Sequence, residues 1–199
     1  VKRKLKGIDI TIYDAEKCFD KLWEKECLND LYNNGLTNDH LNILHLANSN
    51  AKVAIKTTNG LTDRFNISEK IMQGTVWGSL SCTSTMDQLS KLSYRNPEEL
   101  FKYKGVPIPP LEMVDDILTV TSVEKTLKTN HLVNTFIESK RLRLSDKKCA
   151  QIHIGSGHDS CPTLHSQNMK ESIKEKYLGD FIESNGKIQA TIDHRKTKG

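Results

Sequence analysis

Hydrophobic residues alternate with polar residues near the start of the chain and predict a strand. Ile8, Ile10 and Ile12 occupy every second position of "GIDITIYD", and this run stops at Asp14. A period of two is typical of a β-strand. Residues 19–31 instead repeat apolar side chains at three- and four-residue intervals, which predicts an amphipathic helix that "NNG" closes.

The rest of the chain continues in alternating helical and strand-like segments. Helices are predicted over residues 37–49, 78–94 and 123–142, and a single strand over 149–154. Strand pairs are predicted around Asn59-Gly60, around Asn185-Gly186, and on both sides of a turn at Asp115-Asp116. The sequence shows no internal repeat and no convincing linker. This order of elements predicts one α+β domain.

Composition narrows the picture only slightly. The chain has 199 residues and a formal net charge of +4, with basic clusters in "VKRKLKG", "KRLRLSDKK" and "HRKTKG". Such clusters suit a phosphate backbone, but taken alone they are better explained as ordinary solvated surface and chain ends. Five cysteines without a CxxC motif, and the lack of a long apolar span, predict an intracellular protein, in the nucleus or the cytoplasm, with no membrane partner. The chain starts on Val and reads as a piece of a longer protein.

The adjacent aspartates Asp115 and Asp116 suggest chemistry. They stand between apolar residues, where two neighbouring carboxylates are costly unless a cation offsets their charge. Together with Asp14, they give three carboxylates at predicted strand ends. Two divalent cations on such a set activate a hydroxyl and stabilise a leaving phosphate oxygen. A plain hairpin turn is the alternative, and it is the better explanation of the pair taken alone.

Five segments in order carry a resemblance to a known family: "YDAEKCFDKLW" (13–23), "QGTVWGSLSCTSTMD" (73–87), "MVDD" (113–116), "LRLSDKKC" (142–149) and "KYLGD" (176–180). Together they resemble the palm of a reverse transcriptase of the non-LTR (LINE-like) retrotransposon type. The resemblance implies an α+β polymerase palm, a ferredoxin-like antiparallel sheet backed by helices, with part of the fingers. It places the palm over residues 1–187 and the start of the region leading to the thumb over 188–199.

The resemblance also implies a catalytic set. Asp14, Asp115 and Asp116 match the metal ligands, which hold two Mg²⁺ ions with Mn²⁺ as a substitute. Lys148 matches the lysine that donates a proton to the leaving pyrophosphate, a suitable role for a cation. The neighbouring Lys147 stays open as an alternative.

The nucleotide and the primer have their own matches. Ala15 would direct its carbonyl to the metal or nucleotide, and Phe19 would exclude the 2′-OH of an NTP. Gln73 and Gly74 match the loop against the nucleotide and template. Each has a plainer explanation, since Phe19 fits the helix core and Gln73-Gly74 could simply lead into a helix. The primer grip matches Tyr177, Leu178 and Gly179.

The implied activity is that of an RNA-directed DNA polymerase, which extends a primer on an RNA template with dNTPs. Fingers, thumb and a probable endonuclease region would lie elsewhere in the parent polyprotein. Departures from the family are Ser79 for Pro, Met113-Val114 for an aromatic-Ala pair, and Ser145 for Asn. They keep open an inactive remnant or a nucleic-acid-binding module. A nuclease, a group II intron enzyme or a retron enzyme fits the motifs less well.

Overall fold

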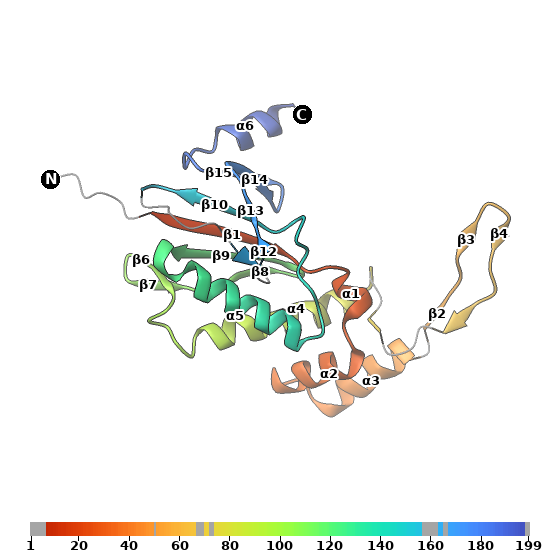
Figure 1. The fold of residues 1–199 in the computed structure, drawn as a ribbon. Helices are drawn as coiled ribbons and strands as arrows, with labels where there is room; N and C mark the ends of the chain where they lie inside the picture. The colour runs from red at the N-terminus through yellow and green to blue at the C-terminus, as the bar shows by residue number, and fades with distance from the viewer. Residues whose placement is uncertain are drawn as a thin grey trace. The chain divides into compact units, whose positions relative to one another are not determined.

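The computed structural model describes residues 7–49, 51–66, 70–71, 74–156, 163–164 and 167–197. The chain divides into two compact units (Figure 1). The first unit consists of Val1–Glu16 and Leu89–Gly199, and the second of Lys17–Gln88. Within the described residues, no helix is long and apolar enough to cross a membrane.

A five-stranded sheet forms the centre of the first unit, in the order β13-β10-β1-β9-β8. All neighbours are antiparallel except β10 and β13. Helix α5 (Thr126–Ser139) runs along one face of the sheet (Figure 1). The predicted antiparallel sheet backed by helices is therefore confirmed. The strands are β1 (Ile8–Asp14), β8 (Leu111–Met113), β9 (Asp116–Ser122), β10 (Ala150–Ile154) and β13 (Lys170–Glu171).

Short elements surround this sheet within the first unit. The hairpin β6–β7 precedes β8, and the 3-10 helix η1 joins β9 to α5. The pairs β11–β12 and β14–β15 follow β10, and α6 comes last. Their bounds are β6 (Phe101–Tyr103), β7 (Val106–Ile108), η1 (Val123–Lys125), β11 (Thr163–Leu164), β12 (Gln167–Asn168), β14 (Lys174–Tyr177), β15 (Asp180–Glu183) and α6 (Gln189–Lys196).

The strand pair expected around Asn185-Gly186 was placed wrongly. The turn between β14 and β15 consists of Leu178 and Gly179, which both have positive φ, as a two-residue hairpin loop favours. Asn185 and Gly186 instead follow β15. There the Asn185 side chain accepts a hydrogen bond from the Lys187 N–H, so Asn-Gly serves as a turn that leads toward α6.

The two faces of β1 carry different chemistry. Asp9, Thr11 and Tyr13 are completely buried on the face that α5 covers. Thr126 and Asn130 of α5 reach across to this face, and Asn130 accepts a 2.6 Å hydrogen bond from the Tyr13 hydroxyl. The isoleucines alternate with these residues and lie on the opposite face. The helix–sheet interface of this unit is therefore unusually polar.

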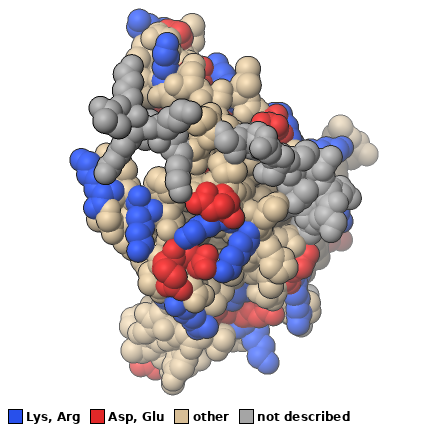
Figure 2. Space-filling view, turned by 60° about the vertical axis from the view of Figure 1, so that its left-hand side comes forward, with Lys and Arg blue, Asp and Glu red and all other residues tan. Residues whose placement is uncertain are grey.

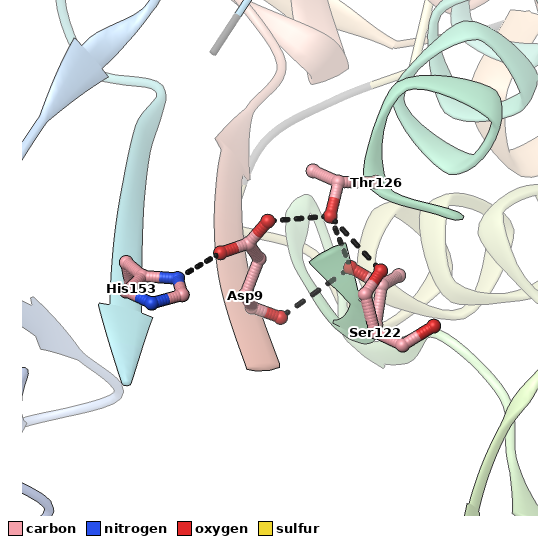
Figure 3. Close-up of polar contacts among 5 residues, drawn as sticks. Asp9, Ser122, Thr126 and His153 are labelled. Atoms are coloured by element: carbon pink, nitrogen blue, oxygen red, sulfur yellow. Dashed lines mark hydrogen bonds and ion pairs between the residues drawn. The ribbon is translucent and has the colours of Figure 1, made fainter. Parts of the chain in front are cut away.

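A buried hydrogen-bonded contact between a carboxylate and an imidazole anchors the start of β1 in this interface (Figure 3). Asp9 lies opposite His153 of β10, and the His153 Nδ1 is 2.8 Å from one carboxylate oxygen. Thr126 donates a 2.6 Å hydrogen bond to the other oxygen, and its hydroxyl also contacts that of Thr121 at 2.9 Å. Both oxygens of a fully buried carboxylate are thus satisfied, as burial of a charge requires.

The second unit begins with two helices where one was expected. The predicted helix is interrupted because Leu22 is extended, with ψ of 132°, and Trp23 forms a β-bridge with Lys70. The Lys70 ammonium lies 4.8 Å above the Trp23 ring, which favours this break. The resulting helices are α1 (Cys18–Lys21) and α2 (Glu24–Asn33).

The remainder of the second unit contains a helix, two short strand pairs and most of α4. The hairpin predicted at Asn59-Gly60 is present, because Thr57 pairs with Gly60. The core gathers small and sulfur-containing side chains, among them Cys18, Cys27 and Met86. The elements are α3 (Asn38–Ser49), β2 (Lys52–Val53), β3 (Lys56–Thr57), β4 (Gly60–Leu61), β5 (Phe65–Asn66) and α4 (Val76–Ser93).

Candidate active site at the Asp14 end of the sheet

Two predicted metal ligands face each other across neighbouring strands. Asp14 is the last residue of β1, and its partner in the antiparallel register is Asp116, the first residue of β9. Met113 also pairs with Asp116, so the turn consists of Val114 and Asp115 and not of Asp115 and Asp116 as predicted. This shift by one residue leaves Asp116 in the strand, beside Asp14.

The turn that presents Asp115 holds a strained residue. Val114 has φ of 61°, a value that β-branched side chains strongly disfavour. Only the first of the two turn residues has positive φ, the combination found in type II′ turns, where Gly is the usual occupant. Strain of this kind typically costs about 1–3 kcal/mol and concentrates at functional sites.

The segment that follows α5 holds the backbone of Asp14 in place. The Ser145 N–H donates a 2.9 Å hydrogen bond to the Asp14 carbonyl, and Ala15 forms a β-bridge with Leu144. The Asp14 N–H donates to the Cys149 sulfur at 3.4 Å. No role at this site was predicted for Cys149 from the sequence. Its position in the fourth motif was the available signal for this contact.

Lys148 binds the Asp14 carboxylate. Its Nζ lies 3.2 Å and 3.1 Å from the two oxygens, although the residues are 134 positions apart in the sequence. This hydrogen bond raises the pKa of Lys148, and the charges of Asp115 and Asp116 raise it further. Of the two lysines left open by the sequence, Lys148 is therefore the one that contacts Asp14.

The carboxylates repel one another. Partial burial raises the pKa of Asp116, and the negative charges of Asp115 and Asp14 raise it further, whereas Lys148 lowers it. A single exposed ammonium therefore does not offset the three carboxylates fully. The Asp14 side chain is 28% exposed, so a cation from solution can reach it.

The site has donor atoms that suit a metal ion, but their arrangement is not yet that of a metal site. The donor set consists of carboxylate oxygens, which hard cations such as Mg²⁺ prefer, and its excess negative charge favours a cation. Within the described residues, however, no group of three or more Asp, Glu, His or Cys side chains is arranged to hold a metal. Both oxygens of Asp14 contact Lys148 instead. The donor chemistry fits, and cation binding would require rearrangement of Asp14 and Lys148.

The residues predicted as the primer grip lie at the tip of the β14–β15 hairpin. The Tyr177 hydroxyl donates a 3.2 Å hydrogen bond to the carbonyl of Leu111 on β8. Burial raises the pKa of Tyr177, and the charges of Asp116 and Glu112 contribute. Leu178 and Gly179 form the exposed turn. The hairpin is thus tied to the strand that leads into the Asp115 turn.

The predicted nucleotide-binding residues are divided between the two units. Ala15 is buried beside Asp14 in the first unit. Phe19 is half-buried in α1, and Gly74 is exposed just before α4, both in the second unit. Gln73 lies outside the described residues. The roles of all four stay predictions.

Acidic and basic side chains are mixed on the face of the molecule that Figure 2 draws. In the face drawn in Figure 2, the described acidic and basic side chains are interspersed and do not form one continuous positive surface. Recognition of a polyanion there would depend on local clusters of charge, since the overall excess is only +4.

A cavity of about 110 Å³ lies elsewhere in the first unit. None of the three carboxylates and no atom of Lys148 lines it, so it is separate from the candidate site. It is mainly apolar and is lined by residues that include Leu92, Leu100, Phe101, Ile108, Val120 and Leu132.

Similarity to known proteins is detectable only at the level of structure. No protein-family model and no curated protein matches the sequence. Telomerase from Candida tropicalis in complex with a TWJ fragment of telomeric RNA matches with a TM-score of 0.62 and 16% identity, over 92% of this chain and 29% of that chain. Apo telomerase from Candida tropicalis, truncated from its C-terminal domain, matches with a TM-score of 0.60 and 18% identity, over 92% of this chain and 35% of that chain. Telomerase from Candida albicans in complex with a TWJ fragment of telomeric RNA matches with a TM-score of 0.57 and 13% identity, over 88% of this chain and 30% of that chain.

The chain has a reverse-transcriptase-like fold. Its α+β architecture is that of a polymerase palm, as the sequence predicted, and it spans about a third of the telomerase chains that it matches. Telomerase catalytic subunits are relatives of reverse transcriptases, so this likeness does not point to the non-LTR retrotransposon branch.

Proposed function

We propose that this chain is the palm of an RNA-directed DNA polymerase, which adds dNTPs to a primer 3′-OH on an RNA template. The observation that carries this proposal is the placement of Asp14, Asp116 and Lys148 at one end of the sheet. Segments more than 100 residues apart in the sequence meet there. A purely structural strand pair has no need for opposed carboxylates: partial burial raises the pKa of Asp116, and the charges of Asp115 and Asp14 raise it further.

The carboxylates would hold the metal ions of this reaction. Asp14, Asp115 and Asp116 would bind two Mg²⁺ ions, with Mn²⁺ as a substitute. Bound metals of this kind activate the attacking hydroxyl and stabilise the leaving phosphate oxygen. The strained turn at Val114 would keep Asp115 at the tip of the hairpin, where its carboxylate is only partly buried.

Lys148 would have two roles. In the absence of metal, its ammonium neutralises part of the charge on Asp14. If metal ions were bound to Asp14 in its place, the Lys148 ammonium would be available to the leaving pyrophosphate. A lysine side chain is ordinarily protonated at neutral pH, so it could supply a positive charge and a proton.

The motif resemblance supports a retrotransposon as the source, with five segments in the order of the non-LTR enzymes. The comparison with telomerases neither favours nor opposes this branch. The fingers, thumb and endonuclease regions would belong to the natural-length protein, and they would complete the contacts to template, primer and nucleotide.

Primer extension by the full-length protein that contains this chain tests the proposal. We expect extension of a DNA primer on an RNA template with dNTPs and Mg²⁺. Asp115→Asn should lower the rate about a thousandfold or more, since it removes a metal ligand. Asp39→Asn is the matched control, because this carboxylate is exposed on α3 in the second unit. Normal extension by Asp115→Asn would refute the metal-ligand assignment.

The assignment of Phe19 has a separate test in the same assay. A bulky ring under the incoming sugar should disfavour an NTP, so Phe19→Ala should raise the use of NTPs relative to dNTPs. Phe65→Ala is a control on an exposed phenylalanine of the same unit. An unchanged preference in a folded Phe19→Ala variant would return Phe19 to the helix core alone.

A nucleic-acid-binding module without catalysis is the second candidate. The observation that favours it is the arrangement of the carboxylates, which is not that of a metal site in the described residues. In that case the natural-length protein would bind a primer–template duplex in a salt-dependent manner but would not extend it. Binding with no extension, and no Mn²⁺ binding dependent on Asp14, would favour this candidate.

A further inference from the structure

Two cysteine side chains from separate elements of the second unit lie in contact. Cys18 is the first residue of α1, and Cys82 lies within α4. Their sulfur atoms are 3.2 Å apart, although 64 positions separate the residues in the sequence. Both side chains are almost completely buried, with exposures of 1% and 0%. Both are thiols in this structure.

We propose that Cys18 and Cys82 form a redox-sensitive modification site, at which hydrogen peroxide produces a reversible disulfide. Peroxide oxidises one thiol to a sulfenic acid and releases water. The second sulfur then attacks the sulfenic sulfur, so that the S–S bond forms and a second water leaves. Two electrons and two protons pass from the thiols to one peroxide molecule, which balances the reaction.

The geometry favours this pair because little movement is needed. A disulfide requires a sulfur separation of about 2.0 Å, so the two atoms must approach by roughly 1 Å. The buried position also retains the sulfenic acid beside its reaction partner and limits further oxidation.

Access to the buried pair would come from α1. This helix has only four residues and begins after Lys17, whose φ of 51° is a left-handed value. A single helical turn is weakly stable by itself, so local opening exposes Cys18 at a modest cost in free energy. The reagent should be small, which favours peroxide over a bulky disulfide such as oxidised glutathione.

The other buried cysteines provide a contrast. The Cys149 sulfur accepts a hydrogen bond from the Asp14 N–H at 3.4 Å and belongs to the first unit. The Cys27 sulfur accepts a hydrogen bond from the Thr85 hydroxyl at 3.5 Å. These contacts make both residues suitable controls.

The disulfide would link the short α1 to the long α4. Because it closes a loop of 64 residues, it should stabilise the second unit against unfolding. We expect the oxidised chain to melt about 5 °C or more above the reduced chain. This inference does not rest on the proposed polymerase activity, because intact mass, peptide mapping and thermal melting do not measure that activity.

Peroxide treatment of the reduced 199-residue chain tests the site. Intact mass should fall by two hydrogen atoms in the monomer, and two of the five thiols should disappear. Peptide mapping should recover one cross-linked species that contains Cys18 and Cys82, and dithiothreitol should reverse it. Cys18→Ser and Cys82→Ser should each prevent the cross-link, whereas Cys27→Ser should retain it.

Several results would overturn the proposal. These are a cross-link to a different cysteine, a disulfide between two chains, or oxidation to sulfinic acid without a cross-link. Retention of all thiols at peroxide concentrations that oxidise exposed methionines would overturn it as well. The peptide map of the wild-type chain decides the matter even if a serine variant fails to fold.

Discussion

Asp9 and Asp14 lie on the same strand, yet their surroundings differ completely. Asp9 is fully buried under α5, and His153 and Thr126 satisfy its two oxygens. Asp14 lies at the open end of β1, opposite a second carboxylate, with one exposed lysine as its partner. Five positions apart in a strand, they also point to opposite faces of the sheet.

The comparison teaches what distinguishes a structural carboxylate from a functional one. The Asp9 charge is matched by groups that the fold itself supplies, so nothing further needs to bind there. The Asp14 end has more negative charge than its one ammonium offsets, and the strained residue Val114 lies in the turn beside Asp115. Charge left unbalanced at an accessible position is what a cation-binding site requires.

The largest expected effect on stability comes from a substitution of Asp9, the buried one of the two aspartates. Asp9→Ala should lower the free energy of unfolding by about 3–5 kcal/mol, because it leaves His153 and Thr126 facing an empty polar site. Urea denaturation of the 199-residue chain measures this loss. Asp39→Ala, on an exposed helix turn, should change stability by no more than about 0.5 kcal/mol. If Asp9→Ala costs less than about 1 kcal/mol, Asp9 is not a structural anchor.

A substitution in the strained turn beside Asp115 should change the free energy of unfolding in the opposite direction. Val114→Gly should raise the free energy of unfolding by about 1 kcal/mol, because Gly adopts φ of 61° without steric cost. Val106→Gly is the matched control, since Val106 lies exposed in strand β7 at an ordinary φ. There Gly should lower stability by about 0.5–1 kcal/mol. Destabilisation by both variants would show that Val114 is not strained.

The lysine on Asp14 should compete with metal ions. Lys148→Met should strengthen Mn²⁺ binding a few-fold, because it removes the ammonium from the carboxylate, whereas Lys147→Met should leave it unchanged. Isothermal titration calorimetry with Mn²⁺ compares the two. Equal effects of the two substitutions would mean that general surface charge acts there, and not a specific contact.

The smallest expected effect is a pH dependence at Asp116. Its pKa is raised in the folded state, so folding favours the protonated form and stability falls as pH rises above the ordinary aspartate range. Asp116→Asn should therefore stabilise the chain at pH 7, by about 0.5 kcal/mol because partial exposure screens the repulsion. The gain should vanish near pH 3, where the wild-type carboxyl is protonated in both states. A gain that is independent of pH would contradict this origin.

Much of the fold was predictable from local pattern. The alternating isoleucines correctly indicated β1, and the Asp pair correctly indicated a hairpin. Periodicity alone could not show that the polar side of β1 faces α5, since that depends on Thr126 and on His153, far along the chain. It also placed the turn one residue late, because Asp suits a turn better than Val114 does.

The candidate site was predictable only as a set of motifs. Nothing local indicates that Lys148, and not Lys147, reaches Asp14, because the segment that carries both lysines is held to β1 by the hydrogen bond from the Ser145 N–H to the Asp14 carbonyl. Asp9 gave no signal as a structural anchor, since its partner His153 is 144 positions away. Both contacts depend on strand pairing between the two ends of the chain.

One titration tests the division of roles between these two aspartates most directly. Mn²⁺ is titrated into the wild-type chain and into Asp14→Asn, and the thermal melting of both is recorded. The account predicts that the wild type binds Mn²⁺ and that Asp14→Asn does not. It also predicts nearly equal melting temperatures for the two chains in the absence of Mn²⁺. Mn²⁺ binding that persists in Asp14→Asn, or no binding by the wild type, would contradict a cation site at the open end of β1.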